Sequence, residues 1–235
     1  MSDRYGIGNA LVDIIAAPSK ALQEVRERVS WLWVPLITVL LLSTASQVTY
    51  LSWVDFDWLV DQSVAAALQG GSDPDTEAAI RQFMQPGMMI ATSVISTVVI
   101  VPVFLVLQAT YLHLVNKVAG KPDLRFGQWF ALSSWSAFPT IFLSIATFVV
   151  LALAPNRQLG QEDISPLSLQ SLLINAEPGS SWATWGTSIT LVSFWTIALL
   201  ALGIMRWAGA SALKAGIIAI APYVLIFGAW ALVIS

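Results

Sequence analysis

Five long apolar runs organise the chain, and each is nearly free of charge in its middle. A membrane span needs roughly 20 consecutive apolar residues, and every run is long enough. Because backbone groups in lipid must bond within their own segment, the runs predict an all-α membrane protein with five transmembrane helices. We place a membrane domain at 31–235, after an N-terminal arm at 1–30. Within that domain the predicted spans are about 31–54, 88–112, 129–154, 182–206 and 212–234.

Three shorter segments have the pattern of amphipathic helices that lie in the membrane interface. Residues 7–29 place apolar side chains at helical spacing with charges between them, and Pro18 should divide this stretch into two helices. Residues 55–84 predict two helices joined by a turn at Gly70-Gly71, and 165–175 predict one more. Short interfacial helices should therefore cover both faces of the bundle.

The connections between the runs alternate in charge. The first and third contain only Arg81 and Arg157 as basic residues, and they hold nine of the 14 acids. Basic loops are retained in the cytoplasm. This predicts a multi-pass protein of a bacterial inner membrane, with a cytoplasmic N-terminus and a periplasmic C-terminus. Nine of the 11 basic residues lie in the arm and in the second and fourth connections: Arg4, Lys20, Arg26, Arg28, Lys117, Lys121, Arg125, Arg206 and Lys214.

Aromatic side chains gather near the ends of the predicted spans. The chain contains 11 tryptophans, a large number for its 235 residues. Trp and Tyr are enriched at membrane interfaces, so they are predicted to be anchors at headgroup depth. This interpretation covers Trp31, Trp33, Tyr50, Trp53, Tyr111, Trp129, Trp182, Trp185 and Trp207.

Composition supports the membrane assignment and excludes several kinds of chemistry. Hydrophobic residues make up 57% of the chain, charged residues make up 11%, and mean hydropathy is +0.74. Soluble domains carry roughly 25% charged residues. The chain has no cysteine, which rules out disulfides and thiolate sites. With a net charge of −3, nucleic acid is not an expected partner, and no cofactor is expected.

Catalytic motifs are equally scarce. His113 is the only histidine, so one chain cannot form a histidine-based zinc site, and a serine nucleophile would have one conventional base. His113 lies near the end of the second run and is interpreted as an interfacial residue. We therefore predict a protein that is not an enzyme. An enzymatic role would require His113 to face a pocket with a serine or a carboxylate.

The polar residues inside the spans are neutral. Charge-coupled carriers place ionisable side chains within the bilayer, and the centres of these runs contain none. Ser and Thr in spans commonly pack helices together. Gln108 is costly in lipid and should face protein or a cavity. Gln108, Ser96 and Ser136 are the candidate polar path through the membrane.

The order of motifs resembles bacterial members of the Yip family, a group of five-span membrane proteins. The positions we match are Gly120, Phe126, Pro139 and the Lys214-Ala215 pair, whereas Leu22 stands where the family pattern has an aromatic residue. The resemblance implies a five-span helical domain with a cytoplasmic N-terminus, and it supplies no catalytic residues. It rests on A-A-P-S-K-A-L (16–22), W-L-W-V-P (31–35), N-K-V-A-G-K-P-D-L-R-F-G-Q-W-F (116–130), S-S-W-S-A-F-P (133–139) and S-A-L-K-A (211–215).

Two function classes follow from these patterns. The favoured one is a non-enzymatic protein that binds or organises anionic lipids or a protein partner, self-association included, through its arm and basic loop. The alternative is a small transporter or channel for a neutral or lipidic solute, lined by Ser and Thr of the second to fourth spans. The candidate lipid or partner contacts are Lys117, Lys121, Arg125, Arg26 and Arg28.

Overall fold

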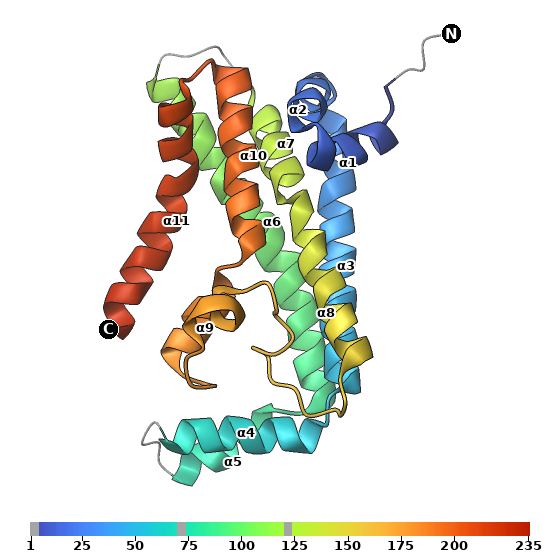
Figure 1. The fold of residues 1–235 in the computed structure, drawn as a ribbon, viewed down its shortest axis with the longest axis vertical. Helices are drawn as coiled ribbons and strands as arrows, with labels where there is room; N and C mark the ends of the chain where they lie inside the picture. Colours follow the sequence, from blue (N-terminus) through green and yellow to red (C-terminus); the bar gives the residue numbers. More distant parts are fainter. Residues whose placement is uncertain (1–4, 70–73, 120–123) are drawn as a thin grey trace. The chain divides into compact units, whose positions relative to one another are not determined.

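The computed structural model describes residues 5–69, 74–119 and 124–235, and this part of the chain is almost entirely helical (Figure 1). The all-α prediction is confirmed. The described residues form α1 (Ile7–Ala16), α2 (Pro18–Glu27), α3 (Trp33–Trp53), α4 (Phe56–Gln69), α5 (Pro74–Phe83), α6 (Pro86–Val118), α7 (Phe126–Ala137), α8 (Ile141–Leu153), α9 (Ser181–Ser188), α10 (Leu191–Ala208) and α11 (Ala212–Ile234).

Within the described ranges, five helical segments are long and apolar enough to cross a membrane, as the hydrophobic pattern predicts. In the third of them, a short 3-10 turn at Phe138–Thr140 joins α7 to α8 at Pro139. This proline cannot donate the backbone hydrogen bond that a straight helix requires there. The segments are Val29–Trp53, Pro86–Val118, Phe126–Leu153, Leu191–Ala208 and Ala212–Ile234.

The chain divides into two compact units. Unit 1 comprises Met1–Leu41, Val99–Ile141 and Ser193–Ile226, and unit 2 comprises Leu42–Val98, Phe142–Val192 and Phe227–Ser235. The described basic residues of the arm and of the second and fourth connections all belong to unit 1. The acidic first and third connections belong to unit 2. The alternation of charge along the sequence therefore matches the division into units, with the basic connections in unit 1 and the acidic connections in unit 2.

In unit 1 the arm forms two helices, α1 and α2, that meet at Ala17 as Pro18 predicts. Ile14 of α1 and Leu22 and Val25 of α2 are fully buried. The two helices contact each other, and α2 also contacts α7. The apolar face of the arm thus packs on protein, and its residues belong to the same core as α7 and α10.

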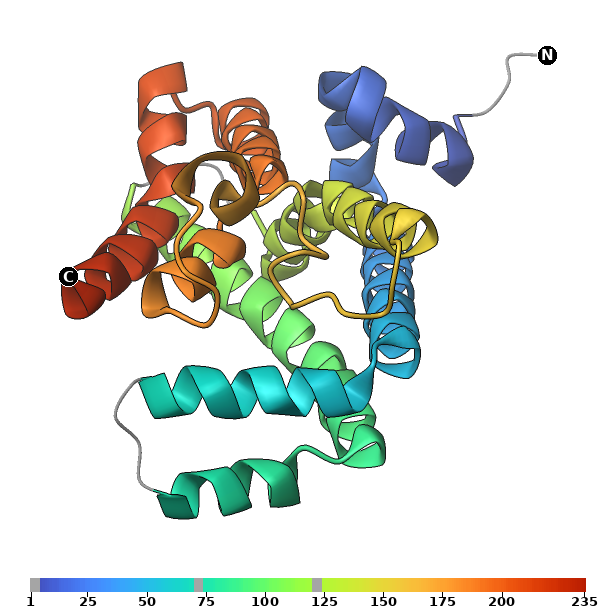
Figure 2. The same ribbon diagram turned by 60° about the horizontal axis from the view of Figure 1, so that its bottom comes forward.

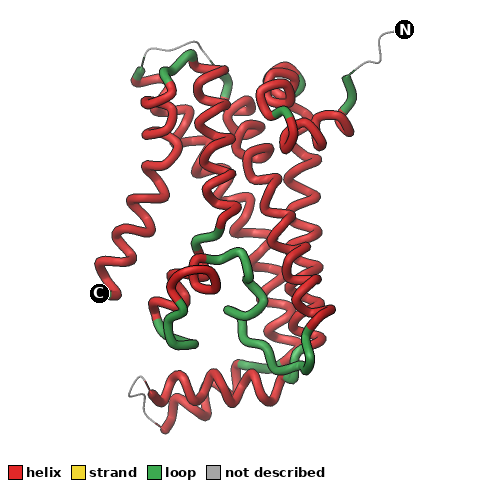
Figure 3. Tube along the Cα trace, in the orientation of Figure 1, coloured by secondary structure: helices red, strands yellow, loops and turns green. Residues whose placement is uncertain are grey.

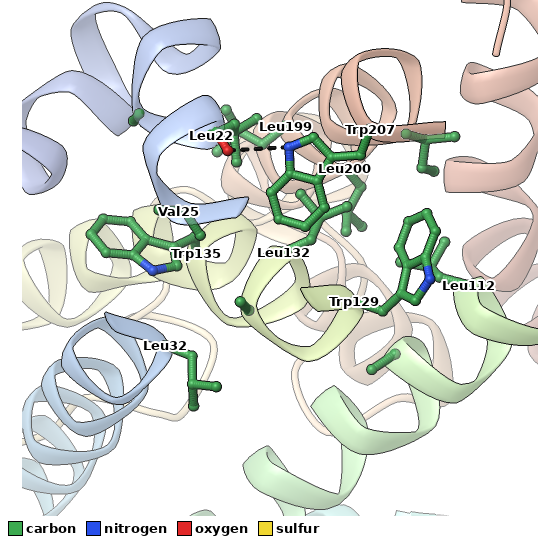
Figure 4. Close-up of a cluster of buried hydrophobic side chains, with 14 of the residues drawn as sticks. Leu22, Val25, Leu32, Leu112, Trp129, Leu132, Trp135, Leu199, Leu200 and Trp207 are labelled. Atoms are coloured by element: carbon green, nitrogen blue, oxygen red, sulfur yellow. Dashed lines mark hydrogen bonds between the residues drawn. The ribbon is translucent and has the colours of Figure 1, made fainter. Parts of the chain in front are cut away.

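Three tryptophans form the centre of the unit 1 core. Trp129, Trp135 and Trp207 expose at most 2% of their surface, and the Trp129 and Trp207 ring centroids are 6.4 Å apart. Figure 4 shows Trp207 directed toward Leu22 and Trp129 directed toward Leu112 of α6. The prediction of interfacial anchors is therefore wrong for Trp129 and Trp207. In unit 2 it is also wrong for Tyr50, which is fully buried.

Gly203 of α10 accommodates a side chain of α7. A methyl group at position 203 would collide with the Leu132 side chain of α7. Both residues are buried within unit 1. Gly203 therefore leaves the space that the Leu132 side chain of α7 occupies against α10.

In unit 2, residues 154–180 form a long connection that is mostly not helical (Figure 3). Side chains from the adjoining helices hold its backbone. The Tyr50 hydroxyl donates to the Leu159 carbonyl at 2.9 Å, and the Thr147 hydroxyl donates to the Ile164 carbonyl at 3.1 Å. Within this connection the predicted helix at 165–175 is reduced to a single π-helical turn, Gln170–Ile174.

The fourth span begins at Leu191 and not at residue 182 as predicted. Residues 182–188 belong to the separate helix α9, and the chain between the two helices is extended at Ile189. There the Leu169 amide donates to the Ile189 carbonyl at 2.8 Å, and the Leu191 amide donates to the Leu167 carbonyl at 2.9 Å. These backbone bonds replace the helical ones, and the sequence Gly-Thr-Ser-Ile-Thr at 186–190 has weak helix propensity.

The first connection forms a hairpin of α4 and α5, which lie side by side (Figure 2). Arg81 of α5 pairs with Asp61 of α4 at 3.0 Å and with Glu77 of its own helix at 2.9 Å. The two predicted helices are confirmed, and the predicted turn at 70–71 lies outside the described residues.

We expect Gly203→Ala to destabilise the protein by about 1–3 kcal/mol, because the added methyl group must displace Leu132. The measurement is thermal unfolding of the purified protein in detergent. Gly216→Ala on α11 is the matched control, since a Cβ there meets no atom within 4 Å. Equal unfolding temperatures for the two variants would contradict close packing at Gly203.

Candidate functional site

The main candidate site is a pocket of about 1210 Å³ in unit 1, which we call the basic pocket. Basic side chains of the arm (Lys20 and Arg26), of the residue preceding α7 (Arg125) and of α10 (Arg206) surround it, and Glu27 is its one acidic lining residue. The remaining lining residues are Ser19, Gln23, Val29, Gly127, Gln128 and Trp207.

Lys20 is positioned by contacts with Asp13 of α1 and with Tyr5, which precedes α1. Its ammonium lies 2.8 Å from an Asp13 carboxylate oxygen and 4.8 Å from the centre of the Tyr5 ring. The Tyr5 hydroxyl donates to the same carboxylate at 2.9 Å. The hydrogen bonds from Lys20 and Tyr5 lower the pKa of Asp13, so this carboxylate remains charged and retains Lys20 in mildly acidic solution.

Gln128 connects two of the three arginines of the pocket, Arg26 and Arg125, through their backbones. Its side-chain carbonyl accepts a hydrogen bond from the Arg125 amide at 3.0 Å, and its amide group donates to the Arg26 carbonyl at 3.2 Å. The Arg26 carbonyl is one of the last four of α2, which have no partner within the helix. One side chain therefore caps the start of α7 and the end of α2 together.

Trp207 forms a second link between α10 and the arm. Its indole nitrogen donates to the Leu22 carbonyl at 3.1 Å, as the dashed line in Figure 4 marks. On the preceding residue, an Arg206 guanidinium nitrogen lies 3.5 Å from the Ser19 hydroxyl. The basic pocket is thus built from residues far apart in the sequence, and the buried Trp207–Leu22 bond ties α10 to the arm beside it.

The structure describes four of the five predicted contact residues and separates them. Arg26 and Arg125 line the basic pocket together. Arg28 instead donates to the Tyr5 carbonyl at 2.6 Å and lies over the Trp31 ring. Lys117 is exposed near the end of α6 and does not line the pocket, and Lys121 lies outside the described residues.

Two residues of the pocket, Lys20 and Arg206, were absent from the predicted contacts. Both belong to the nine basic residues of the arm and of the second and fourth connections, and nothing in their local sequence distinguishes them from the others. Pro18 at the start of α2 and the aromatic residue next to Arg206 are the only nearby signals.

The three residues of the candidate polar path are placed differently from one another. Gln108 is half-buried on α6. Ser136 is buried on α7, and Ser96 is exposed on α6. None of the three lines the basic pocket, so this site gives no support to the polar path.

His113 packs edge-on against Phe126, with ring centroids 6.3 Å apart. It does not line the basic pocket. Among the described residues, no group of three or more His, Asp or Glu side chains could hold a metal ion. The arrangement that the structure does present is a cluster of positive charge beside hydrogen-bond donors, which suits an anionic ligand.

Comparison with known protein families matches residues 12–233 to the Yip1 domain. The chain belongs to the Yip1 family. Its five candidate spans fit a Yip1 membrane protein, and the resemblance seen in the sequence motifs is confirmed. No curated protein and no solved structure matches the chain. The Yip1 family is not a known enzyme family.

We expect Gln128→Glu to weaken the docking of the end of α2 by about 1–3 kcal/mol, because a carboxylate cannot donate to the Arg26 carbonyl. Hydrogen exchange of amides 20–28 should accelerate, while the start of α7 keeps its cap from the retained acceptor. Gln23→Glu is the control, since it adds the same charge to the same pocket without a capping role. Equally fast exchange in the two variants would contradict the capping role of Gln128.

Proposed function

We propose that this Yip1 protein is a non-enzymatic membrane protein that binds the headgroups of anionic phospholipids in its basic pocket. The observation that carries the proposal is the convergence of Lys20, Arg26, Arg125 and Arg206 on one pocket. Phosphate oxygens accept hydrogen bonds from guanidinium groups in a bidentate manner, which favours arginine in such sites. Three of these four residues are arginines.

The local surroundings of the pocket support a lipid ligand. Trp207 and Val29 contribute apolar surface next to the charges, so a headgroup could be held while its glycerol region remains in contact with apolar groups. The arm that forms one wall has the amphipathic character of an interfacial segment. Each basic residue near an anionic membrane contributes about 1 kcal/mol to binding.

The proposal includes an orientation. Since basic connections are retained on the cytoplasmic side, the arm and the basic pocket would face the cytoplasmic leaflet of a bacterial inner membrane, with the C-terminus in the periplasm. Anionic lipids of that leaflet would then be the ligands available to the pocket.

We expect the double variant Arg26→Gln, Arg125→Gln to lose about 2 kcal/mol of binding to a short-chain phosphatidylglycerol, or roughly thirtyfold in affinity. The measurement is titration of the protein in neutral nanodiscs. Binding by the unmodified protein should weaken as salt is raised, because exposed charges are screened.

The matched control for the double variant is Arg28→Gln with Lys117→Gln. It removes the same amount of charge from unit 1 but from outside the basic pocket. Its affinity for the short-chain lipid should stay within threefold of the unmodified protein. An equal loss in both double variants would show a diffuse charge effect and would contradict a defined headgroup site.

Because the chain has no cysteine, single cysteines can test the orientation. In intact bacterial cells, a membrane-impermeant maleimide should label Gln158→Cys in the third connection and should not label Ser211→Cys in the fourth. Both side chains are exposed. The reverse labelling pattern would overturn the proposed orientation and leave the binding of anionic lipid to be judged by the titration alone.

A further inference from the structure

A second cavity lies in unit 1 among α6, α7, α10 and α11, apart from the basic pocket. Its volume is about 260 Å³, and it shares no residue with the basic pocket. Apolar side chains form most of its wall, together with Asn116, Trp129 and Lys214. The apolar lining residues are Leu112, Val115, Ala119, Ile204, Ala210 and Ile218.

Trp129 contributes a polar atom that the protein itself leaves without a partner. Its side chain is 1% exposed, and its indole nitrogen has no hydrogen-bond acceptor among the described residues. Figure 4 shows the ring directed from α7 toward Leu112, another residue of this cavity. A buried N–H group without a partner costs free energy, so an acceptor brought by a ligand would be bound favourably.

The other polar lining residues fit the same ligand chemistry. Lys214 is exposed and brings a positive charge to the cavity, and Asn116 is a buried amide residue in its wall. The cavity is smaller than the roughly 300–1,000 Å³ typical of sites for drug-sized ligands. Such a volume suits one alkyl chain better than a ring system or the two chains of a phospholipid.

We propose that this cavity binds a single alkyl chain that ends in an anionic oxygen headgroup. The Trp129 indole donates to an oxygen of the headgroup, Lys214 neutralises its charge, and the chain lies against the apolar wall. A free fatty acid or a single-chain phospholipid could supply this chemistry. The inference stands independently of the proposed function, because none of the basic-pocket residues takes part.

The test uses a dodecanoate that carries a photoreactive diazirine on its last carbons, with the whole protein in neutral phosphatidylcholine nanodiscs. Illumination should label the cavity residues of α6 and α11, and excess dodecanoate should displace the probe. Competition with dodecyl phosphate distinguishes a phosphate-bearing ligand from a carboxylate. Dodecanol should compete at least tenfold more weakly than dodecanoate, because it brings no charge to Lys214 and the indole. Equal competition by dodecanol would overturn the inference.

Three variants identify the residues involved. Trp129→Phe keeps the ring and removes the N–H, and it should raise the dodecanoate concentration for half-displacement about tenfold. Lys214→Met should raise it about fivefold. Ala119→Trp, at an exposed position in the cavity wall, should block labelling without disturbing the core.

Trp135→Phe is the matched control for Trp129→Phe. It removes another buried indole N–H that has no partner among the described residues, but Trp135 does not line this cavity. Dodecanoate binding should be unchanged in this control and in Arg26→Gln, Arg125→Gln. The same loss in Trp129→Phe and Trp135→Phe, or full labelling in Ala119→Trp, would overturn the proposed site.

Discussion

The arm of unit 1 is held in place by side chains that reach backbone carbonyls on or next to α2. Gln128 binds the carbonyl of Arg26, Trp207 binds that of Leu22, and Ser134 donates to that of Leu32 at 2.8 Å. The bonds to Leu22 and Leu32 are buried, so loss of either donor would leave a buried carbonyl without its partner. The basic pocket exists only while these bonds keep α2 against α7 and α10.

This dependence explains why an arm with interfacial character is also part of the protein core. Leu22 and Val25 pack among residues of α7 and α10, while Lys20 and Arg26 face the pocket on the polar side of the same helix. The apolar positions of the ten-residue helix α2 therefore pack in the core, and its charged positions line the pocket. A membrane leaflet and a protein surface both select an amphipathic helix, and the local pattern of residues does not distinguish them.

Local signals predicted most of the fold, and tertiary contacts account for the rest. Local sequence alone determines the five apolar runs, the break at Pro18 and the charge asymmetry. These features were therefore predictable without the structure. The start of the fourth span was not, because Ile189 bonds with Leu169, which comes from the preceding connection. For the site, Arg26 and Arg125 were predicted, but Lys20 and Arg206 join them only through folding. Trp129 and Trp207 were wrongly predicted to be interfacial anchors, because a tryptophan near a span end has the same sequence context whether it contacts lipid or protein.

The break before Leu191 leaves α10 with 18 residues, whereas α6 has 33. At 1.5 Å per residue these helices are about 27 Å and about 50 Å long, against a hydrocarbon core of about 30 Å. The shorter helix favours a thinner bilayer, while the longer one must tilt or extend beyond the hydrocarbon. Hydrophobic mismatch of opposite sign within one chain would make the protein sensitive to the chain length of the surrounding lipids.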